Sequence, residues 1–194
     1  GVDVTKDYRK IRERVGVLPQ DFEPFDRLRP REAVKYWATL FGRALTADEN
    51  AEVIETVGLT SRAETQGLHL SGGERRRLGI AMALVGTPDL IFLDEPTTGL
   101  DPSARRELWA VIRSLKAAGK TVLLTTHYLD EAEYCNRIML IHAGRIIAIG
   151  SPQELKQEHQ GDGWWYDGVP QAVRLKVSQR SEEDQGKRGG KEAY

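Results

Sequence analysis

The chain has 194 residues, and its 28 Lys and Arg residues nearly balance its 29 Asp and Glu residues, which gives a formal net charge of −1. This length suits one domain with a sizeable core, and the balanced charge gives no sequence-wide electrostatic case for nucleic acid as a partner. The single cysteine, Cys135, excludes a disulfide within the chain and is expected to be a small buried residue. No apolar run approaches the about 20 residues that span a bilayer. We therefore expect neither a membrane span nor a signal peptide, and any connection to a membrane through a partner.

The start of the chain predicts a strand that ends beside a glutamine. Residues 1–4 read as a short strand that begins abruptly, as in a truncated chain. Residues 14–18 favour a better strand, which Pro19 ends. Gln20 then lies just past this strand, at the ligand-facing edge of a sheet if the strand is parallel to its neighbours.

Residues 21–58 predict a small helical unit. Three larger apolar residues lie among charges before its first helix: Phe22, Phe25 and Leu28. They suit an interface and packing within the unit equally well. Apolar residues at helical spacing predict the first helix over residues 31–41. A capping box of Thr46 and Glu49 begins the second helix, which Gly58 ends. The expected buried face of this helix carries Ala51, Ile54 and Val57.

A helix start with two glycines follows in the sequence LSGGE, residues 70–74. Ser71 is a favoured N-cap residue, and Gly72 and Gly73 let a ligand approach the backbone closely. The exposed N–H groups and the positive end of the helix dipole suit a phosphate group. The helix is expected to continue through Ala83.

A buried strand then delivers two carboxylates. Residues 90–93 are four apolar residues in a row, as in a strand buried on both faces of a parallel sheet. Asp94 and Glu95 follow at the carboxyl end, where α/β sheets place ligands, and an extended strand would point them to opposite faces. The aspartate suits Mg²⁺, and the glutamate could orient or deprotonate a water molecule. The alternative, an acidic pair on a solvated loop, is disfavoured by the order of these features.

One helix and one strand follow and bring a histidine toward the same edge. Asp101 is expected to cap the helix, with Pro102 at its first position and Gly119 at its end. Residues 121–125 predict a buried strand. His127 follows Glu95 by 32 residues, the length of one helix and one strand, so parallel strands would place both side chains at one sheet edge.

Two local patterns in this region favour structural roles. The GKT at residues 119–121 follows a helix and precedes a strand, which is the reverse of a phosphate-binding loop. Three acidic residues after His127 are expected to form the solvated face of a short helix rather than a metal site: Asp130, Glu131 and Glu133.

The last part of the chain predicts a hairpin, a short helix and one more strand. Residues 137–141 and 145–149 are the hairpin strands, and Ser151 and Glu154 form a capping box for a helix to about residue 159. Residues 164–166 are an aromatic cluster that suits an interface or a small appendage. Alternation predicts a strand at residues 173–177, and residues 178–194 read as a disordered tail.

Taken together, these motifs resemble those of the nucleotide-binding subunits of ATP-binding cassette (ABC) transporters. LSGGE resembles the family's signature loop, which usually ends in Gln, so Glu74 is a departure. LIFLDE at residues 90–95 resembles the Walker B strand, and GLD at residues 99–101 the D-loop. Gln20 is similar to the Q-loop glutamine and His127 to the switch histidine. The resemblance runs from about residue 15 to about residue 152.

The resemblance implies an α/β fold of the P-loop NTPase type, with a parallel sheet, flanking helices and a small helical subdomain at about residues 22–85. It implies a partial ABC ATPase domain over residues 1–160, whose N-terminal part is missing, and an appendage and tail over residues 161–194.

The resemblance also implies ATP and Mg²⁺ at a site between two subunits. Asp94 and Gln20 would hold Mg²⁺, Glu95 would be the general base, and Gln20 and His127 would position water and phosphate. The signature residues would bind the nucleotide of the facing subunit: Ser71, Gly72, Gly73 and Glu74. Asp101 would couple the two sites.

The implied function is that of a cytoplasmic ATPase subunit, peripheral to the membrane, that powers an integral membrane permease. Its implied partners are that permease and a second nucleotide-binding subunit, with no nucleic acid. LSGGERRR and THYLDEAE are most similar to subunits of drug or polysaccharide exporters. No GxxxxGK[ST] motif occurs in the 194 residues, so this chain alone is expected to bind ATP poorly and to hydrolyse it negligibly. The alternatives are a non-catalytic regulatory ABC subunit and a soluble ABC ATPase of DNA repair or translation.

Overall fold

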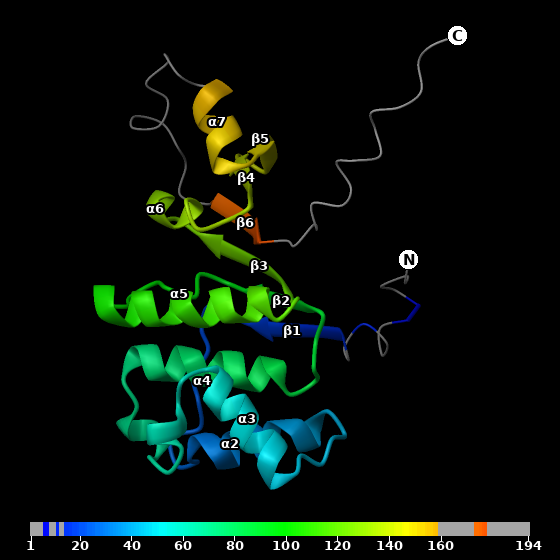
Figure 1. The fold of residues 1–194 in the computed structure, drawn as a ribbon, viewed down its shortest axis with the longest axis vertical. Coiled ribbons are helices and arrows are strands. Elements are labelled where there is room, and N and C mark those ends of the chain that lie inside the picture. Colours follow the sequence, from blue (N-terminus) through cyan, green and yellow to red (C-terminus); the bar gives the residue numbers. More distant parts are fainter. Residues whose placement is uncertain (1–5, 8–10, 12–13, 159–172, 178–194) are drawn as a thin grey trace.

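The computed structural model describes residues 6, 7, 11, 14–158 and 173–177, and within them six strands form one sheet (Figure 1). The strands are β1 (Val15–Leu18), β2 (Leu90–Leu93), β3 (Thr121–Thr126), β4 (Arg137–His142), β5 (Arg145–Gly150) and β6 (Val173–Val177). Their order across the sheet is β1-β2-β3-β6-β4-β5. The predicted strand at residues 1–4, the cluster at 164–166 and the tail at 178–194 lie outside the described residues.

The sheet has a parallel part and an antiparallel part. β1, β2 and β3 are parallel, as predicted, with Val15 opposite Leu90 and Leu90 opposite Thr121. The predicted hairpin of β4 and β5 is confirmed, and the predicted strand β6 runs antiparallel between β3 and β4. Because β1, β2 and β3 are parallel, the residues that follow each of them lie at one edge of the sheet.

The helices lie toward both ends of the molecule in the view of Figure 1. They are α2 (Pro30–Leu40), α3 (Ala47–Thr56), α4 (Gly72–Leu84), α5 (Pro102–Ala117), α6 (Leu129–Ala132) and α7 (Pro152–Glu158), with two 3₁₀ turns, η1 (Thr60–Arg62) and η2 (Gly67–His69), between α3 and α4. In Figure 1, α2, α3 and α4 lie at the lower end, and α7 lies with the β4–β5 hairpin at the upper end. No helix in the described part of the chain is both long and apolar enough to cross a membrane.

Side-chain caps begin the helices where the sequence predicts them. The capping boxes of α3 and α7 are both formed, by Thr46 with Glu49 and by Ser151 with Glu154. The end of α5 is also as predicted, because Gly119 takes the left-handed conformation, with φ of 81°, that ends many helices. The GKT sequence is therefore part of a helix end.

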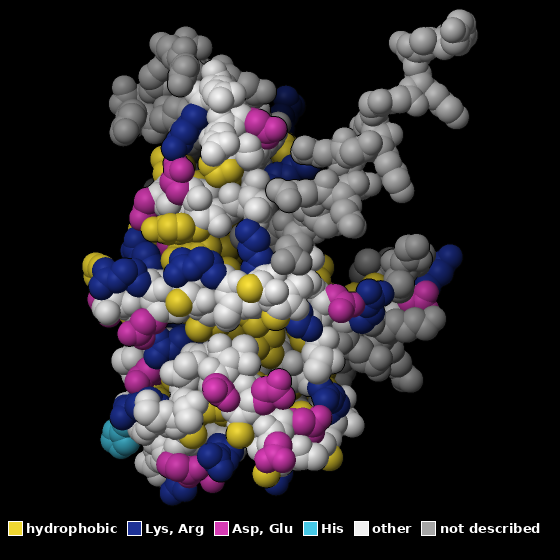
Figure 2. All heavy atoms as spheres, viewed as in Figure 1, with side chains coloured by type: hydrophobic (Ala, Val, Ile, Leu, Met, Phe, Trp, Pro, Cys, Tyr) yellow, Lys and Arg dark blue, Asp and Glu magenta, His cyan; other side chains and the backbone are white. Residues whose placement is uncertain are grey.

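Two glycines allow α4 to pack directly on β1. A Cβ atom added at Gly16 would clash with the backbone oxygen of Ala83, and one added at Gly79 would clash with Cδ1 of Leu18. The close approach buries Leu18 and Leu78 completely. In Figure 2, apolar side chains show beside α5, and basic and acidic side chains are interspersed over the rest of the visible face.

The predicted buried face of α3 is wrong at one position. Ala51 is exposed, and Asn50 is buried beside Ile54 and Val57. The physical reason is a hydrogen bond, since Asn50 Nδ2 donates to the backbone oxygen of Arg31 at 3.0 Å and so satisfies one polar group inside the helical unit.

The predicted solvated face of α6 is also wrong at one position, because Glu131 is fully buried against α5. An arginine of that helix, Arg105, lies with its Nε 3.9 Å from Oε1 of Glu131. A buried carboxylate with a nearby cation is the usual exception to the rule that charges stay in water. Of the described residues, no three or more His, Cys, Asp or Glu form a group able to hold a metal ion.

Candidate functional site

Three of the predicted site residues meet at one carboxylate oxygen at the edge of the parallel strands. Gln20 Nε2 donates to Glu95 Oε2 at 3.2 Å, and His127 Nδ1 lies 3.4 Å from the same oxygen. Thr98 Oγ1 also donates to this oxygen, at 3.1 Å. Gln20, Glu95 and His127 follow the ends of β1, β2 and β3, so the parallel register brings them together.

Thr125 fixes both acidic residues and was not predicted as a site residue. Its hydroxyl donates to Asp94 Oδ1 at 2.5 Å and accepts a hydrogen bond from the backbone N–H of Glu95 at 2.9 Å. The pairing of Leu93 with Leu124 places Thr125 beside Asp94. The sequence does show a threonine two residues before His127. Its role could be predicted only with knowledge of the register between β2 and β3.

The backbone turns sharply at the acidic pair. β2 ends at Leu93, so Asp94 and Glu95 do not alternate across an extended strand as expected. Glu95 has a φ of 43°, a left-handed conformation that is strained for a glutamate. Such strain costs about 1–3 kcal/mol and occurs often at functional sites, where the surrounding contacts hold it in place. Here the hydrogen bonds of Thr125 and Gln20 hold it.

This arrangement suits proton transfer to a carboxylate at a partly open edge. The side chains of Glu95 and His127 are 25% and 32% exposed, so water can reach both. Glu95 can accept a proton, while the Gln20 amide and the His127 imidazole can hold a water molecule or a phosphate oxygen by hydrogen bonds.

The same edge fits Mg²⁺ through its oxygen donors. Asp94 is exposed and uses Oδ1 for Thr125, and Gln20 uses its Nε2 for Glu95, which leaves one carboxylate oxygen and one amide oxygen for an ion. Mg²⁺ is usually held by one or two carboxylates together with water and substrate phosphates. A site with a single carboxylate in place therefore suits Mg²⁺ better than an ion that needs a full cage of protein ligands.

An aromatic side chain and an arginine of α5 support His127. The rings of His127 and Tyr128 lie 4.1 Å apart between centroids, and the Arg105 guanidinium lies 4.3 Å from the Tyr128 centroid. Arg105 also faces Asp130 and the buried Glu131, at 3.7 and 3.9 Å. Sequence reasoning missed this support, because the spacing of Arg105 on α5 gives no sign of what it packs against.

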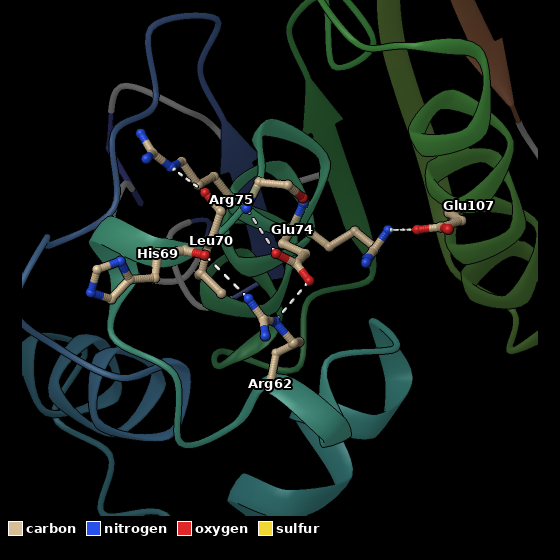
Figure 3. Close-up of polar contacts among 8 residues, drawn as sticks. Arg62, His69, Leu70, Glu74, Arg75 and Glu107 are labelled. Atoms are coloured by element: carbon tan, nitrogen blue, oxygen red, sulfur yellow. Dashed lines mark hydrogen bonds and ion pairs between the residues drawn. The ribbon is translucent and has the colours of Figure 1, made fainter.

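A second group of contacts lies at the start of α4, around Glu74 (Figure 3). Ser71 Oγ accepts a hydrogen bond from Glu74 N at 3.2 Å, and Ser71 N donates to Glu74 Oε2 at 2.8 Å, so the predicted N-cap is confirmed. A Cβ added at Gly73 would lie 2.7 Å from the Cβ of Ala104, which means that α4 touches the first turn of α5 here. Asp101 begins that turn: its Oδ1 accepts from Ser103 N and Ala104 N at 2.8 and 3.1 Å, and these bonds lower the pKa of Asp101.

Arg76 connects the signature helix to the turn that carries Gln20. Its Nη1 donates to the backbone oxygen of Gln20 at 2.5 Å and to that of Pro19 at 3.3 Å. Burial lowers the pKa of Arg76, and the charge of Asp21 opposes that shift. Arg76 therefore links the helix that begins at Gly72 to the turn that carries Gln20.

Comparison with known proteins agrees with the motifs. The family model described as ABC transporter matches residues 1–98, just over half of the chain. The chain is 50% identical over 153 residues to the Nod factor export ATP-binding protein I of Cupriavidus metallidurans, and this match covers 75% of the chain and 49% of that relative. It is 46% identical over 170 residues to the protein of the same name from Burkholderia pseudomallei, which covers 83% of the chain and 54% of that relative.

A more distant relative carries a different description. The chain is 38% identical over 164 residues to the Escherichia coli protein named "Probable multidrug ABC transporter ATP-binding protein YbhF", which covers 84% of the chain and 28% of that relative. The chain thus spans about half, or less, of the length of these curated relatives.

Proposed function

The chain belongs to the ABC transporter family, and from this membership we propose that it is part of an ATP-binding and ATP-hydrolysing subunit that powers export through a separate membrane permease. The relatives' names support export, since they refer to Nod factor export and to a multidrug transporter. The single observation that carries the proposal is the meeting of Gln20 and His127 at one oxygen of Glu95.

In the proposed reaction, Glu95 takes the proton of the water that attacks the terminal phosphate of ATP. Gln20 and His127 orient that water and the phosphate oxygens through hydrogen bonds. Thr125 keeps both carboxylate residues in position, as its two hydrogen bonds indicate. Mg²⁺, when bound through Asp94 and Gln20, would neutralise charge that develops on the phosphates.

The proposed role of the signature is to contact the nucleotide held by a facing subunit. The N–H groups of Gly72 and Gly73 at the start of α4 would bind phosphate oxygens, and the Glu74 carboxylate would hold the N–H group of Ser71. Asp101 would couple the two sites, a role supported by its position at the start of the helix that Gly73 touches.

An exposed apolar surface beside the Gln20 turn is the proposed contact with the permease. Phe25 and Tyr36 are 40% and 47% exposed and pack edge to face, with ring centroids 5.3 Å apart. Leu68, 56% exposed, lies near Phe25, because its N–H donates to the backbone oxygen of Asp26, the residue after Phe25. Exposed aromatic groups of this kind are enriched at protein interfaces. The subunit would then work at the cytoplasmic face of the membrane.

The test is an ATPase assay on the complete gene product. Replacement of Glu95 by Gln keeps the shape of the side chain and removes the base, so we expect hydrolysis to fall by about 10²–10⁴-fold while ATP binding persists. The matched control is Glu52→Gln, which removes a carboxylate from the exposed side of α3. Equal hydrolysis by the Glu95→Gln and Glu52→Gln variants would show that Glu95 is not the base.

A second candidate is a subunit that contributes only its signature to a partner's site, for which the cap formed by Ser71 and Glu74 is in place. The 194 residues contain no GxxxxGK[ST] motif. Equilibrium dialysis of the complete gene product with radiolabelled ATP and Mg²⁺ separates the alternatives, because a catalytic subunit binds ATP stoichiometrically and a subunit that contributes only its signature does not. Stoichiometric, Mg²⁺-dependent binding would support the catalytic subunit, and its absence would support the second candidate.

A further inference from the structure

Glu74 places a carboxylate in the first turn of α4, beside the glycine pair that is proposed to contact phosphate. Its side chain is only 17% exposed, and Oε2 accepts the hydrogen bond from Ser71 N. A negative charge here suits the positive end of the helix dipole. The same charge repels an arriving phosphate, whereas a glutamine in this place would carry no charge.

Arg62, the last residue of η1, lies against this carboxylate (Figure 3). Its Nε is 2.9 Å from Oε1 of Glu74, although the N–H bond is not aimed at that oxygen, so the contact is an ion pair rather than a hydrogen bond. The Nη2 atom of the same guanidinium donates to the backbone oxygen of His69 at 3.1 Å. One side chain therefore contacts both the Glu74 charge and the backbone that leads into the signature.

The neighbouring arginines have other partners. Arg75 donates to the backbone oxygens of Leu70 and Leu68, at 3.0 and 3.2 Å. Arg76 binds the Gln20 turn, and Arg77 pairs with Glu107. Within the described part of the chain, Arg62 is thus the cation that forms an ion pair with Glu74.

We infer that Arg62 is a positioning residue of the signature: its charge offsets that of Glu74, and its hydrogen bond to His69 holds the segment before the helix. The start of α4 can then present the N–H groups of Gly72 and Gly73 to a phosphate without a repelling charge beside them. The inference rests on the proposed function, because it assumes that these N–H groups receive a phosphate.

The experiment titrates inorganic triphosphate into the full 194-residue chain at low salt, followed by the backbone amide resonances of Gly72 and Gly73. Four proteins are compared: wild type, Arg62→Met, Glu74→Gln and the double variant. We expect Arg62→Met to weaken triphosphate binding by about 3- to 10-fold, and Glu74→Gln in that background to restore it, because the repelling charge is gone. The loss should shrink as salt screens the charge.

Two further variants separate the charge from the hydrogen bond. Arg62→Lys keeps the charge without the guanidinium fork, and we expect its affinity for triphosphate to stay near that of wild type. Arg75→Met removes an arginine that holds Leu68 and Leu70 but does not pair with Glu74, so Glu74→Gln should not rescue it. If Arg62→Met and the double variant bind triphosphate equally weakly, the inference is overturned, because Arg62 would then act through its hydrogen bond to the backbone alone.

A thermal unfolding cycle over the same four proteins distinguishes this inference from the proposed function. If triphosphate moves neither glycine resonance in the wild type, the proposed phosphate contact is wrong. In that case, salt-dependent coupling between positions 62 and 74 in the melting temperatures would still support Arg62 as the charge partner. Absence of that coupling would overturn the charge-partner role.

Discussion

A single hydroxyl group, that of Thr125, organises the sheet edge at the scale of one residue. It donates to Asp94 and accepts from the backbone N–H of Glu95, the residue with the strained φ of 43°. Because valine has the same shape without the hydroxyl, Thr125→Val would leave the Glu95 N–H without its acceptor and Asp94 without its donor.

We expect Thr125→Val to lower the free energy of unfolding by about 1–3 kcal/mol, the cost of leaving such groups unpaired. Urea denaturation followed by circular dichroism measures this change. The matched control is Thr121→Val, on the same face of β3, which should change stability by no more than about 0.5 kcal/mol. Equal stability of the two variants would mean that the Thr125 bonds do not hold the edge together.

The sequence was sufficient for the residues that follow each strand but not for those that support them. Gln20 and His127 could be placed near Glu95 because strand ends and a parallel sheet determine their position. Thr125 and Arg105 could not, because their roles depend on register and on which helix face packs against which loop. Long polar side chains such as Arg105 reach partners that no local spacing specifies.

At the scale of elements, the helix starts were predictable because a cap is a local pattern of three or four residues. In α3, Thr46 N donates to Glu49 Oε2 at 2.8 Å, and Glu49 N donates to Thr46 Oγ1 at 3.2 Å. The hydrogen bonds from Thr46 hold the pKa of Glu49 below its ordinary value of 4.5. The unfolded chain therefore takes up this proton at a higher pH than the folded chain.

This cap predicts a definite pH dependence. The stabilisation by Glu49 is fully present above the unfolded pKa of about 4.5 and is lost as pH falls through the lower folded value. The side chain introduced by Glu49→Gln does not titrate, so wild type should exceed this variant in stability at neutral pH, and the difference should shrink below about pH 4.5. Urea unfolding at several pH values measures it.

Thr46→Ala provides the matched control for the pH experiment. It removes the side-chain partner of the cap, so the pH-dependent effect of the Glu49→Gln substitution on stability should become smaller in this background. Suppose that, with Thr46 in place, Glu49→Gln changes stability by the same amount at neutral and at acidic pH. The cap would then not bind the ionised form of Glu49 preferentially.

At the scale of the whole molecule, the parallel strands and the hairpin could be predicted, but the position of β6 could not. Five alternating residues identify a strand at Val173–Val177, yet they do not specify its neighbours. The structure places β6 between β3 and β4, so these two strands each pair with β6 and not with each other. These two pairings join residues that are 47 to 55 positions apart for β3 and 33 to 39 positions apart for β4, and local patterns carry no signal over such separations.

Cys135 offers one probe of the folded state of the whole chain. It lies between α6 and β4 and is 5% exposed. Burial is the larger cause, and the negative charge of Glu131 the smaller one, of a rise in the pKa of the Cys135 thiol to about 12. We expect its reaction with a thiol reagent at about pH 8 to be about 10³-fold slower in the folded chain than in urea, because the thiolate reacts and the thiol does not. The absorbance of the group that a chromogenic thiol reagent releases measures the rate of this reaction.

The thiol experiment needs no variant, since the chain has one cysteine. Similar rates with and without urea would mean that the region around α6 and β4 is open in solution. A third outcome is that the thiol reacts slowly in water and begins to react faster at a urea concentration below that of global unfolding. That result would identify a local opening of the region around α6 and β4.

The contact between Gly73 and Ala104 has a consequence for how this protein can change over evolutionary time. A side chain at position 73 would lie 2.7 Å from the Cβ at position 104, so the two positions share one small volume. A methyl group can be gained at the first only if one is lost at the second. Among homologues we therefore expect the sizes of these two residues to be inversely correlated, with glycine at position 104 in lineages where position 73 carries alanine or serine.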